Sequence, residues 1–157
     1  KDKKIENISL VCCGNDNGYL KNLKKYVNKK NLSEKIKFLD YVDDEDLPSL
    51  YLNSSILVMT SLIGPTNIPP WEAFKLGIPV IYPNLEGIRE IYGESVLYYD
   101  PLNEDDLATK IKNLYFDNEL QKKLVLNGKK KIEEIEKKGE FKNVILKIND
   151  FFKKNDL

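Results

Sequence analysis

Short apolar runs with no polar alternation constrain this chain more than any other feature. Residues 55–59 form the clearest run, of the kind found in parallel strands that are covered on both faces. Similar runs occur at residues 8–13, 36–39, 79–82 and 96–99, and helical patterns separate them. The sequence therefore predicts an α/β fold, with a parallel sheet of about five strands, helices on both faces and right-handed crossovers.

Capping residues fix the ends of several expected helices. Gly77 stands at the C′ position of a brief helix over residues 70–76, and Asn103 precedes the helix that follows the last strand. Asp43 or Asp44 is the expected N-cap of a third, short helix.

Length and charge restrict the class of protein. The 157 residues suffice for a single domain, 1–157, in which residues 118–157 form a lysine-rich helical tail packing on the rest. We expect two helices in this tail, broken near Lys138-Gly139. Lys+Arg and Asp+Glu both number 25, so no overall charge draws the chain to nucleic acid. Residues 41–118 hold four basic and thirteen acidic groups, which argues against a polyanion-binding surface there.

The two cysteines indicate a reducing compartment. Cys12 and Cys13 are adjacent in an apolar run, where neighbours point to opposite faces, so a mutual disulfide would be strained. We expect both to be small buried side chains of a cytoplasmic protein. The chain has no His, which argues against a structural zinc site. No apolar stretch reaches the roughly 20 residues of a transmembrane segment.

Residues 60–74 carry the pattern that points to ligand binding. They follow the 55–59 strand and open a helix, and ligands of open parallel sheets bind at the carboxyl ends of the strands. The start of a helix presents unpaired N–H groups and a partial positive charge, which suit a diphosphate. Because Pro69 and Pro70 have no N–H, other residues must supply the donors. The expected contacts are the backbone groups of Gly64, Thr66, Asn67 and Ile68, with the Thr66 hydroxyl, the Asn67 amide and the stiffening ring of Pro65 beside them.

Glu72 is the expected carboxylate of this site. It lies about one turn into the helix, and a carboxylate can accept hydrogen bonds from both hydroxyls of a ribose 2′,3′-diol. A second interpretation stays open, in which Glu72 only complements the helix dipole.

The segment resembles the signature of family-four retaining glycosyltransferases, in which two Glu residues bracket a loop rich in Gly and Pro. Aligned without gaps, Glu72 falls on the second Glu and Ala73 on the family's Ala. Pro69-Pro70 and Gly77-Ile78-Pro79-Val80 match the positions around them. The first Glu, which in the family usually contacts sugar hydroxyls, is replaced here by Gly64.

Further matches extend the resemblance over most of the chain. Residues 8–14, 38–42, 47–51, 87–90 and 100–107 stand where such enzymes have similar residues. The resemblance implies a Rossmann-like sheet in the carboxyl-terminal, donor-binding half of an enzyme of the GT-B fold. The implied reaction is retaining hexosyl transfer from a UDP-, GDP- or ADP-sugar in polysaccharide or glycoconjugate biosynthesis, with no metal required. It also implies that Gly14, Tyr41 and Val42 border the nucleotide base, although Tyr41 and Val42 could equally pack a strand end.

The same resemblance implies that two parts lie outside this chain. They are the amino-terminal acceptor domain, through which any contact with a membrane surface would come, and the first strand and helix of the donor domain. That strand is central in the Rossmann-like order, so its loss would leave two strands with unpaired edges unless the remaining strands or another chain fill the gap. We therefore expect the isolated chain to bind nucleotide weakly and to transfer no sugar.

Three other functions stay open. A non-catalytic domain that binds a nucleotide sugar or a partner is compatible with Gly64 in place of Glu. A receiver-type signalling domain has a similar size and class, but the chain has no Lys-Pro pair and no Asp at the end of the 55–59 strand. A structural helical partner would account for residues 118–157 alone.

Overall fold

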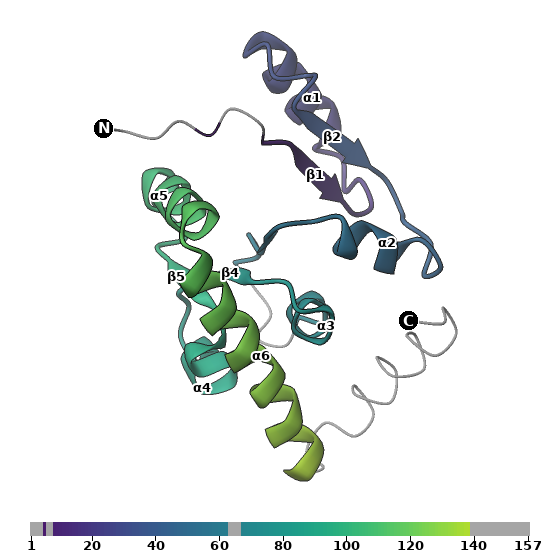
Figure 1. Ribbon diagram of the computed structural model, residues 1–157. Coiled ribbons are helices and arrows are strands. Elements are labelled where there is room, and N and C mark those ends of the chain that lie inside the picture. Colours follow the sequence, from purple (N-terminus) through teal and green to yellow (C-terminus); the bar gives the residue numbers. More distant parts are fainter. Residues whose placement is uncertain (1–4, 6–7, 63–66, 139–157) are drawn as a thin grey trace. The chain divides into compact units, whose positions relative to one another are not determined.

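The computed structural model describes residues 5, 8–62 and 67–138 (Figure 1). Within this part the chain forms five strands that pair only in parallel, as the sequence predicts. They fall into two sheets, of order β1-β2 and β3-β4-β5. The strands are β1 (Leu10–Cys13), β2 (Ile36–Leu39), β3 (Leu57–Val58), β4 (Val80–Pro83) and β5 (Leu97–Tyr99).

Helices connect successive strands, which is the expected α/β alternation. They are α1 (Leu20–Lys29), α2 (Leu47–Leu52), α3 (Pro69–Leu76), α4 (Ile88–Tyr92), η1 (Gly93–Ser95), α5 (Glu104–Phe116) and α6 (Asn118–Lys138). None of the described helices combines the length and the apolar character needed to cross a membrane. The chain divides into two compact units, Lys1–Leu47 and Pro48–Leu157.

The first unit holds β1, α1 and β2. Cys12 lies opposite Phe38 and Cys13 opposite Leu39 in the parallel register. The expectation that both cysteines are buried is wrong, because Cys12 is only half-buried and Cys13 is exposed. A sheet of two strands gives each side chain few neighbours, so an apolar run does not become a buried strand here. Even this partial burial raises the pKa of the Cys12 thiol above its usual value.

The second unit is built around β4. This strand pairs with β3 on one edge and β5 on the other, and it is buried at every position. The expectation that residues 55–59 form the most buried strand is wrong, since β3 comprises only Leu57–Val58 and is half-buried. The described β3 has a partner along one edge only, whereas β4 has one along both.

Neighbouring residues of β4 point to opposite faces, and helices cover both. Ile81 belongs to an apolar cluster with Leu114 of α5 and Leu124 of α6. Tyr82 packs on the other face with Tyr92 of α4, at 5.0 Å between ring centroids. Trp71 and Phe74 of α3 complete that aromatic cluster. Figure 1 shows α6 running beside α3, and the two helices are in contact.

Two of the three predicted caps are confirmed. Gly77 ends α3 in the left-handed conformation, with φ 75°, and the Asn103 side chain accepts a hydrogen bond from the N–H of Asp106 at 3.0 Å. The expected N-cap at Asp43 or Asp44 is wrong. There the Asp43 carbonyl accepts from two N–H groups in a turn, and α2 begins only at Leu47.

The tail begins as predicted. α6 is one helix over Asn118–Lys138, up to the last described residue, and it packs against α3, α5 and η1. The expected break near Lys138-Gly139 stays a prediction. The second predicted tail helix lies outside the described residues.

Candidate functional site

The candidate loop connects the carboxyl end of β3 to the start of α3. At its first end, the N–H of Met59 donates to the carbonyl of Ile81 at 2.9 Å. The Met59 carbonyl accepts from the hydroxyl of Tyr99, a residue of β5, at 3.1 Å. This bond holds the end of β3. Gly64, Pro65 and Thr66, three of the predicted binding residues, lie outside the described residues. The other end of the loop, from Asn67 on, is described.

Asn67 is fixed by two tyrosines with fully buried side chains. Its Nδ2 donates to the hydroxyl oxygen of Tyr82 at 2.7 Å, and the hydroxyl of Tyr92 donates to its carbonyl at 3.2 Å. Burial raises the pKa of Tyr92 far above its usual value, so its hydroxyl remains a donor. The Asn67 amide, predicted to face a ligand, therefore donates into the protein and holds the loop end.

Ile68 and Glu72 stand at the start of α3. The Ile68 carbonyl accepts from the N–H groups of Trp71 at 2.9 Å and Glu72 at 3.3 Å, and the Ile68 side chain is 46% exposed. Glu72 is half-buried in the first turn, as the sequence places it. Its Oε2 accepts a hydrogen bond of 2.8 Å from the hydroxyl of Tyr51, a residue of α2 that is only 8% exposed. The carboxylate is thus held in place by a buried donor.

Gly14, Tyr41 and Val42 belong to the first unit. The N–H of Gly14 donates to the carbonyl of Asp40 at 3.2 Å, so the carboxyl ends of β1 and β2 lie side by side. Gly14 has φ 141°, a conformation that favours glycine. Tyr41 is 66% exposed and Val42 is half-buried. The contact of these residues with a base stays a prediction.

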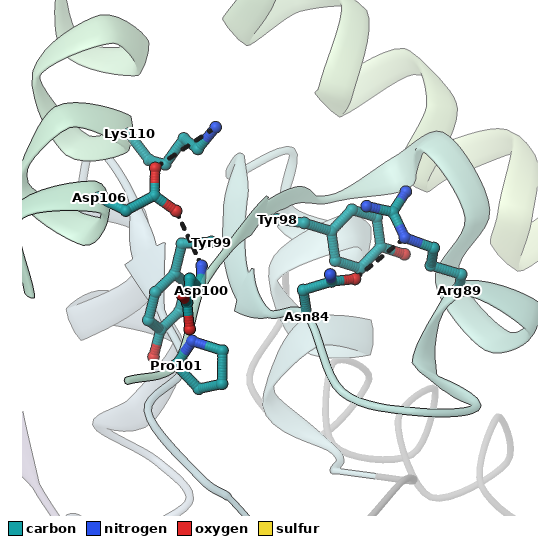
Figure 2. A pocket seen from close by; sticks show the side chains of 8 residues that line it. All are labelled: Asn84, Arg89, Tyr98, Tyr99, Asp100, Pro101, Asp106 and Lys110. Atoms are coloured by element: carbon teal, nitrogen blue, oxygen red, sulfur yellow. Dashed lines mark hydrogen bonds and ion pairs between the residues drawn. The ribbon is translucent and has the colours of Figure 1, made fainter. Parts of the chain in front are cut away.

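A separate cavity of about 370 Å³ lies at the carboxyl ends of β4 and β5 (Figure 2). Arg89 donates from Nε to the Asn84 side chain at 3.0 Å, and its guanidinium lies 4.3 Å from the ring centroid of Tyr98. The sequence leaves two partners open for Arg89, a phosphate or, as the favoured one, Glu86 or another nearby acid. The structure places an amide and an aromatic ring against it. Of the predicted site residues that the structure describes, none lines this cavity. Its lining residues are Asn84, Arg89, Tyr98, Tyr99, Asp100, Pro101, Asp106 and Lys110.

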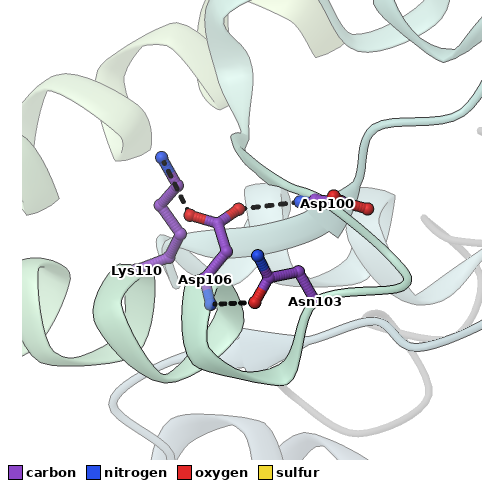
Figure 3. A network of polar contacts seen from close by, with 4 residues as sticks. All are labelled: Asp100, Asn103, Asp106 and Lys110. Carbon is purple, nitrogen blue, oxygen red and sulfur yellow. Dashed lines mark hydrogen bonds and ion pairs between the residues drawn. The ribbon is translucent and has the colours of Figure 1, made fainter.

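The acidic groups of this cavity accept hydrogen bonds from the backbone, and one of them forms an ion pair. Asp106 accepts from the N–H of Asp100 at 2.8 Å and forms an ion pair with Lys110 at 3.7 Å (Figure 3). Asp100 in turn accepts from the N–H of Leu102. These contacts stabilise the connection between β5 and α5.

The residues that sequence reasoning missed are tyrosines. The hydroxyl of each one forms a hydrogen bond to an end of the candidate loop or to the carboxylate of Glu72. These residues are Tyr51, Tyr82, Tyr92 and Tyr99. One signal could have found them, since a buried tyrosine needs a partner for its hydroxyl. The partner itself cannot be read from the sequence.

Comparison with known proteins settles the family. Residues 1–131 match the family Glycosyl transferases group 1. The chain belongs to this family. The predicted resemblance to glycosyltransferases is thereby confirmed at the level of the group 1 family.

Individual proteins and solved structures that the chain resembles agree with its assignment to this family. O-antigen chain mannosyltransferase B of Escherichia coli is 36% identical over 76 residues, which are 48% of this chain and 20% of that protein. The chain therefore spans about a fifth of the length of this relative. HepE of Anabaena, solved in complex with UDP-glucose, has TM-score 0.70 and 21% identity, covering 79% of this chain and 35% of that one.

A third similar structure covers one domain of a protein. It is the C-terminal domain of the group 1 protein LpcC from Francisella tularensis, with TM-score 0.65 and 25% identity over 76% of this chain and 63% of that one. These likenesses confirm the predicted Rossmann-like α/β fold of GT-B type.

Proposed function

We propose that this group 1 domain binds the nucleoside diphosphate sugar in a retaining, family-four glycosyltransferase. One observation carries the proposal. The half-buried Glu72 stands in the first turn of the helix that follows the candidate loop, and a buried hydroxyl holds its carboxylate. The family match and the similarity to HepE, which was solved with UDP-glucose, support it.

The chemistry divides between the loop and the helix. The backbone N–H groups of Gly64, Thr66, Asn67 and Ile68, with the positive end of α3 behind them, would bind the diphosphate. Glu72 would accept from the ribose hydroxyls. No group of the proposed site calls for a metal, and we propose that binding proceeds without one.

The relatives suggest which donor to test first. The E. coli relative is described as a mannosyltransferase, so a mannosyl group is the first candidate for the transferred hexose. The acceptor would be bound by an amino-terminal domain, as in the predicted two-domain arrangement.

A second function is favoured by one specific residue. Gly64 stands where the family has its first Glu, so a domain that binds nucleotide sugar without transferring the sugar is the alternative. Sugar transfer by a longer protein that includes this chain would exclude it.

The proposal is tested by titrating the chain with UDP, GDP and ADP and measuring the amide NMR shifts at each step. We expect binding in the millimolar range, with shifts at Asn67 and Ile68, and no sugar transfer by this chain alone. Glu72→Ala removes acceptors for the ribose and should weaken binding about tenfold or more. Glu104→Ala is the matched control, because Glu104 also lies in the first turn of a helix. Equal affinity of the Glu72→Ala variant and the wild type would refute the site.

A further inference from the structure

We infer that Tyr51 is a positioning residue, which holds the Glu72 carboxylate ready for the ribose hydroxyls of the nucleotide. The inference rests on the proposed function, since it assigns a role to a neighbour of the proposed ribose ligand. Tyr51 itself would touch neither the sugar nor the phosphates.

The contacts place Tyr51 at the base of α3. It lies on the inward face of α2 and is 8% exposed, so its ring has little room to move. Its hydroxyl is 2.8 Å from Oε2 of Glu72 and 3.5 Å from the carbonyl oxygen of Pro69. Both partners belong to the first turn of α3, where the helix receives the candidate loop. One hydroxyl therefore links α2 to the carboxylate and to the backbone beside it.

The hydrogen-bonding capacities of these groups make a shared site possible. A phenol donates one hydrogen, whereas an ionised carboxylate offers about four acceptor positions. The Tyr51 bond uses one of these positions, so it is compatible with ribose hydroxyls that donate to the same carboxylate. Hydrogen bonds to an ionised acceptor are stronger than neutral ones, so the geometry of the carboxylate matters for affinity.

The physical benefit is preorganisation. A free glutamate side chain loses rotamer freedom when a ligand fixes it, and that loss weakens binding. Because Tyr51 already fixes one oxygen of Glu72, little further ordering is needed when the ribose arrives. Without the hydroxyl, the carboxylate loses one of the contacts that hold it, so the ribose contact should be weaker.

A purely structural role of the bond between Tyr51 and Glu72 would give a different result in binding experiments. If Tyr51 only joined α2 to α3, its loss would affect all nucleotides alike. If it positions Glu72, its loss should affect only the preference for a ribose over a sugar that lacks the 2′ and 3′ hydroxyls. The ratio of the two dissociation constants is therefore the informative quantity.

The experiment measures this ratio by amide NMR for the whole chain. UDP, GDP and ADP are each compared with the corresponding 2′,3′-dideoxynucleoside diphosphate, for the wild type and for Tyr51→Phe. The wild type should prefer the ribonucleotide by about tenfold or more. Tyr51→Phe should reduce this preference by about threefold or more and leave the affinity for the dideoxy compound unchanged. Tyr98→Phe is the control, since its hydroxyl donates to the Gly93 carbonyl and not to Glu72.

Two further variants separate the possible failures. Glu72→Ala should abolish the preference; if it does not, or if no nucleotide binds, the proposed function fails and the inference with it. If Glu72→Ala abolishes the preference while Tyr51→Phe keeps it, only the role of Tyr51 is refuted. Glu72→Asp keeps Tyr51 and the charge but shortens the side chain, so it should also lower the preference. An unchanged preference in Glu72→Asp would show that the position of the carboxylate does not matter.

Discussion

Gly128 of α6 lies so close to the ring of Phe74 in α3 that no side chain fits between them. A Cβ on Gly128 would stand 2.6 Å from Cδ1 and 2.8 Å from Cγ of Phe74. Phe74 is 1% exposed and belongs to the aromatic cluster on one face of β4. Like Phe74, Glu72 belongs to α3. The contact between Gly128 and Phe74 therefore holds α6 against the helix of the candidate site.

We predict that Gly128→Ala destabilises the protein. Alanine is a better helix former than glycine by about 1 kcal/mol, but the clash with a buried ring costs about 1–3 kcal/mol. The midpoint of urea unfolding should therefore fall, with an unchanged slope. Gly128→Ala should cost less when it is added to Phe74→Ala than to the wild type, because alanine lacks the Cγ and Cδ1 atoms that clash. A midpoint at or above that of the wild type would show that α3 and α6 are not held this closely.

Tyr82→Phe should loosen the end of the candidate loop. The change removes the acceptor of the Asn67 side chain while the ring stays in the cluster. We expect the free energy of unfolding to fall by about 1 kcal/mol and nucleotide binding to weaken.

Tyr98→Phe is the comparison for this effect, because it also removes one buried tyrosine hydroxyl bond but lies away from the loop. Its stability should fall by a similar amount and its nucleotide affinity should stay the same. Equal affinities of the two variants would contradict a role of Tyr82 in binding.

Local rules predicted the parts of the fold that depend on a few consecutive residues. The strand at residues 36–39 has the predicted bounds, and Gly77 and Asn103 cap their helices as expected. A left-handed glycine and a side-chain N-cap involve groups within three or four positions. These features could therefore be read from the sequence without knowing the rest of the structure.

The features that the sequence did not predict depend on distant partners. β4 is the most buried strand because both of its edges are paired, and no property of residues 80–83 alone shows this. Cys13 is exposed because its sheet has only two strands. The hydroxyls of Tyr51, Tyr92 and Tyr99 find partners 21, 25 and 40 positions away. The position of Glu72 could be predicted, but the donor that holds it could not.

Asn103→Ala should destabilise α5 by removing its N-cap. The side chain accepts from the N–H of Asp106, next to the network that joins Asp106 to Asp100 and Lys110 (Figure 3). Loss of such a cap typically costs about 1 kcal/mol. Asn103→Asp and Asn103→Ser keep an acceptor and should stay close to the wild type in thermal and urea unfolding. Equal stability of the Ala and Asp variants would show that the cap contributes nothing.

The pH dependence of stability should change above the ordinary range of tyrosine. Burial raises the pKa of Tyr98 to about 12, against the lowering effect of the nearby Arg89 guanidinium. In the unfolded chain a tyrosine ionises near pH 10. Between these two values the unfolded state has lost the proton and the native state has kept it. The stabilising contribution of Tyr98 is therefore complete below about pH 10 and is lost as the pH rises toward about 12.

Tyr98→Phe tests this directly, because phenylalanine does not ionise. Urea unfolding of the wild type and the variant between about pH 9 and 11.5 should show a shallower decline of the free energy of unfolding in the variant. Loss of the bond to Gly93 lowers the stability of the variant at every pH, so the slope and not the level is the informative quantity. Parallel curves for the wild type and Tyr98→Phe would mean that the native protein does not hold the Tyr98 proton more tightly than the unfolded chain does.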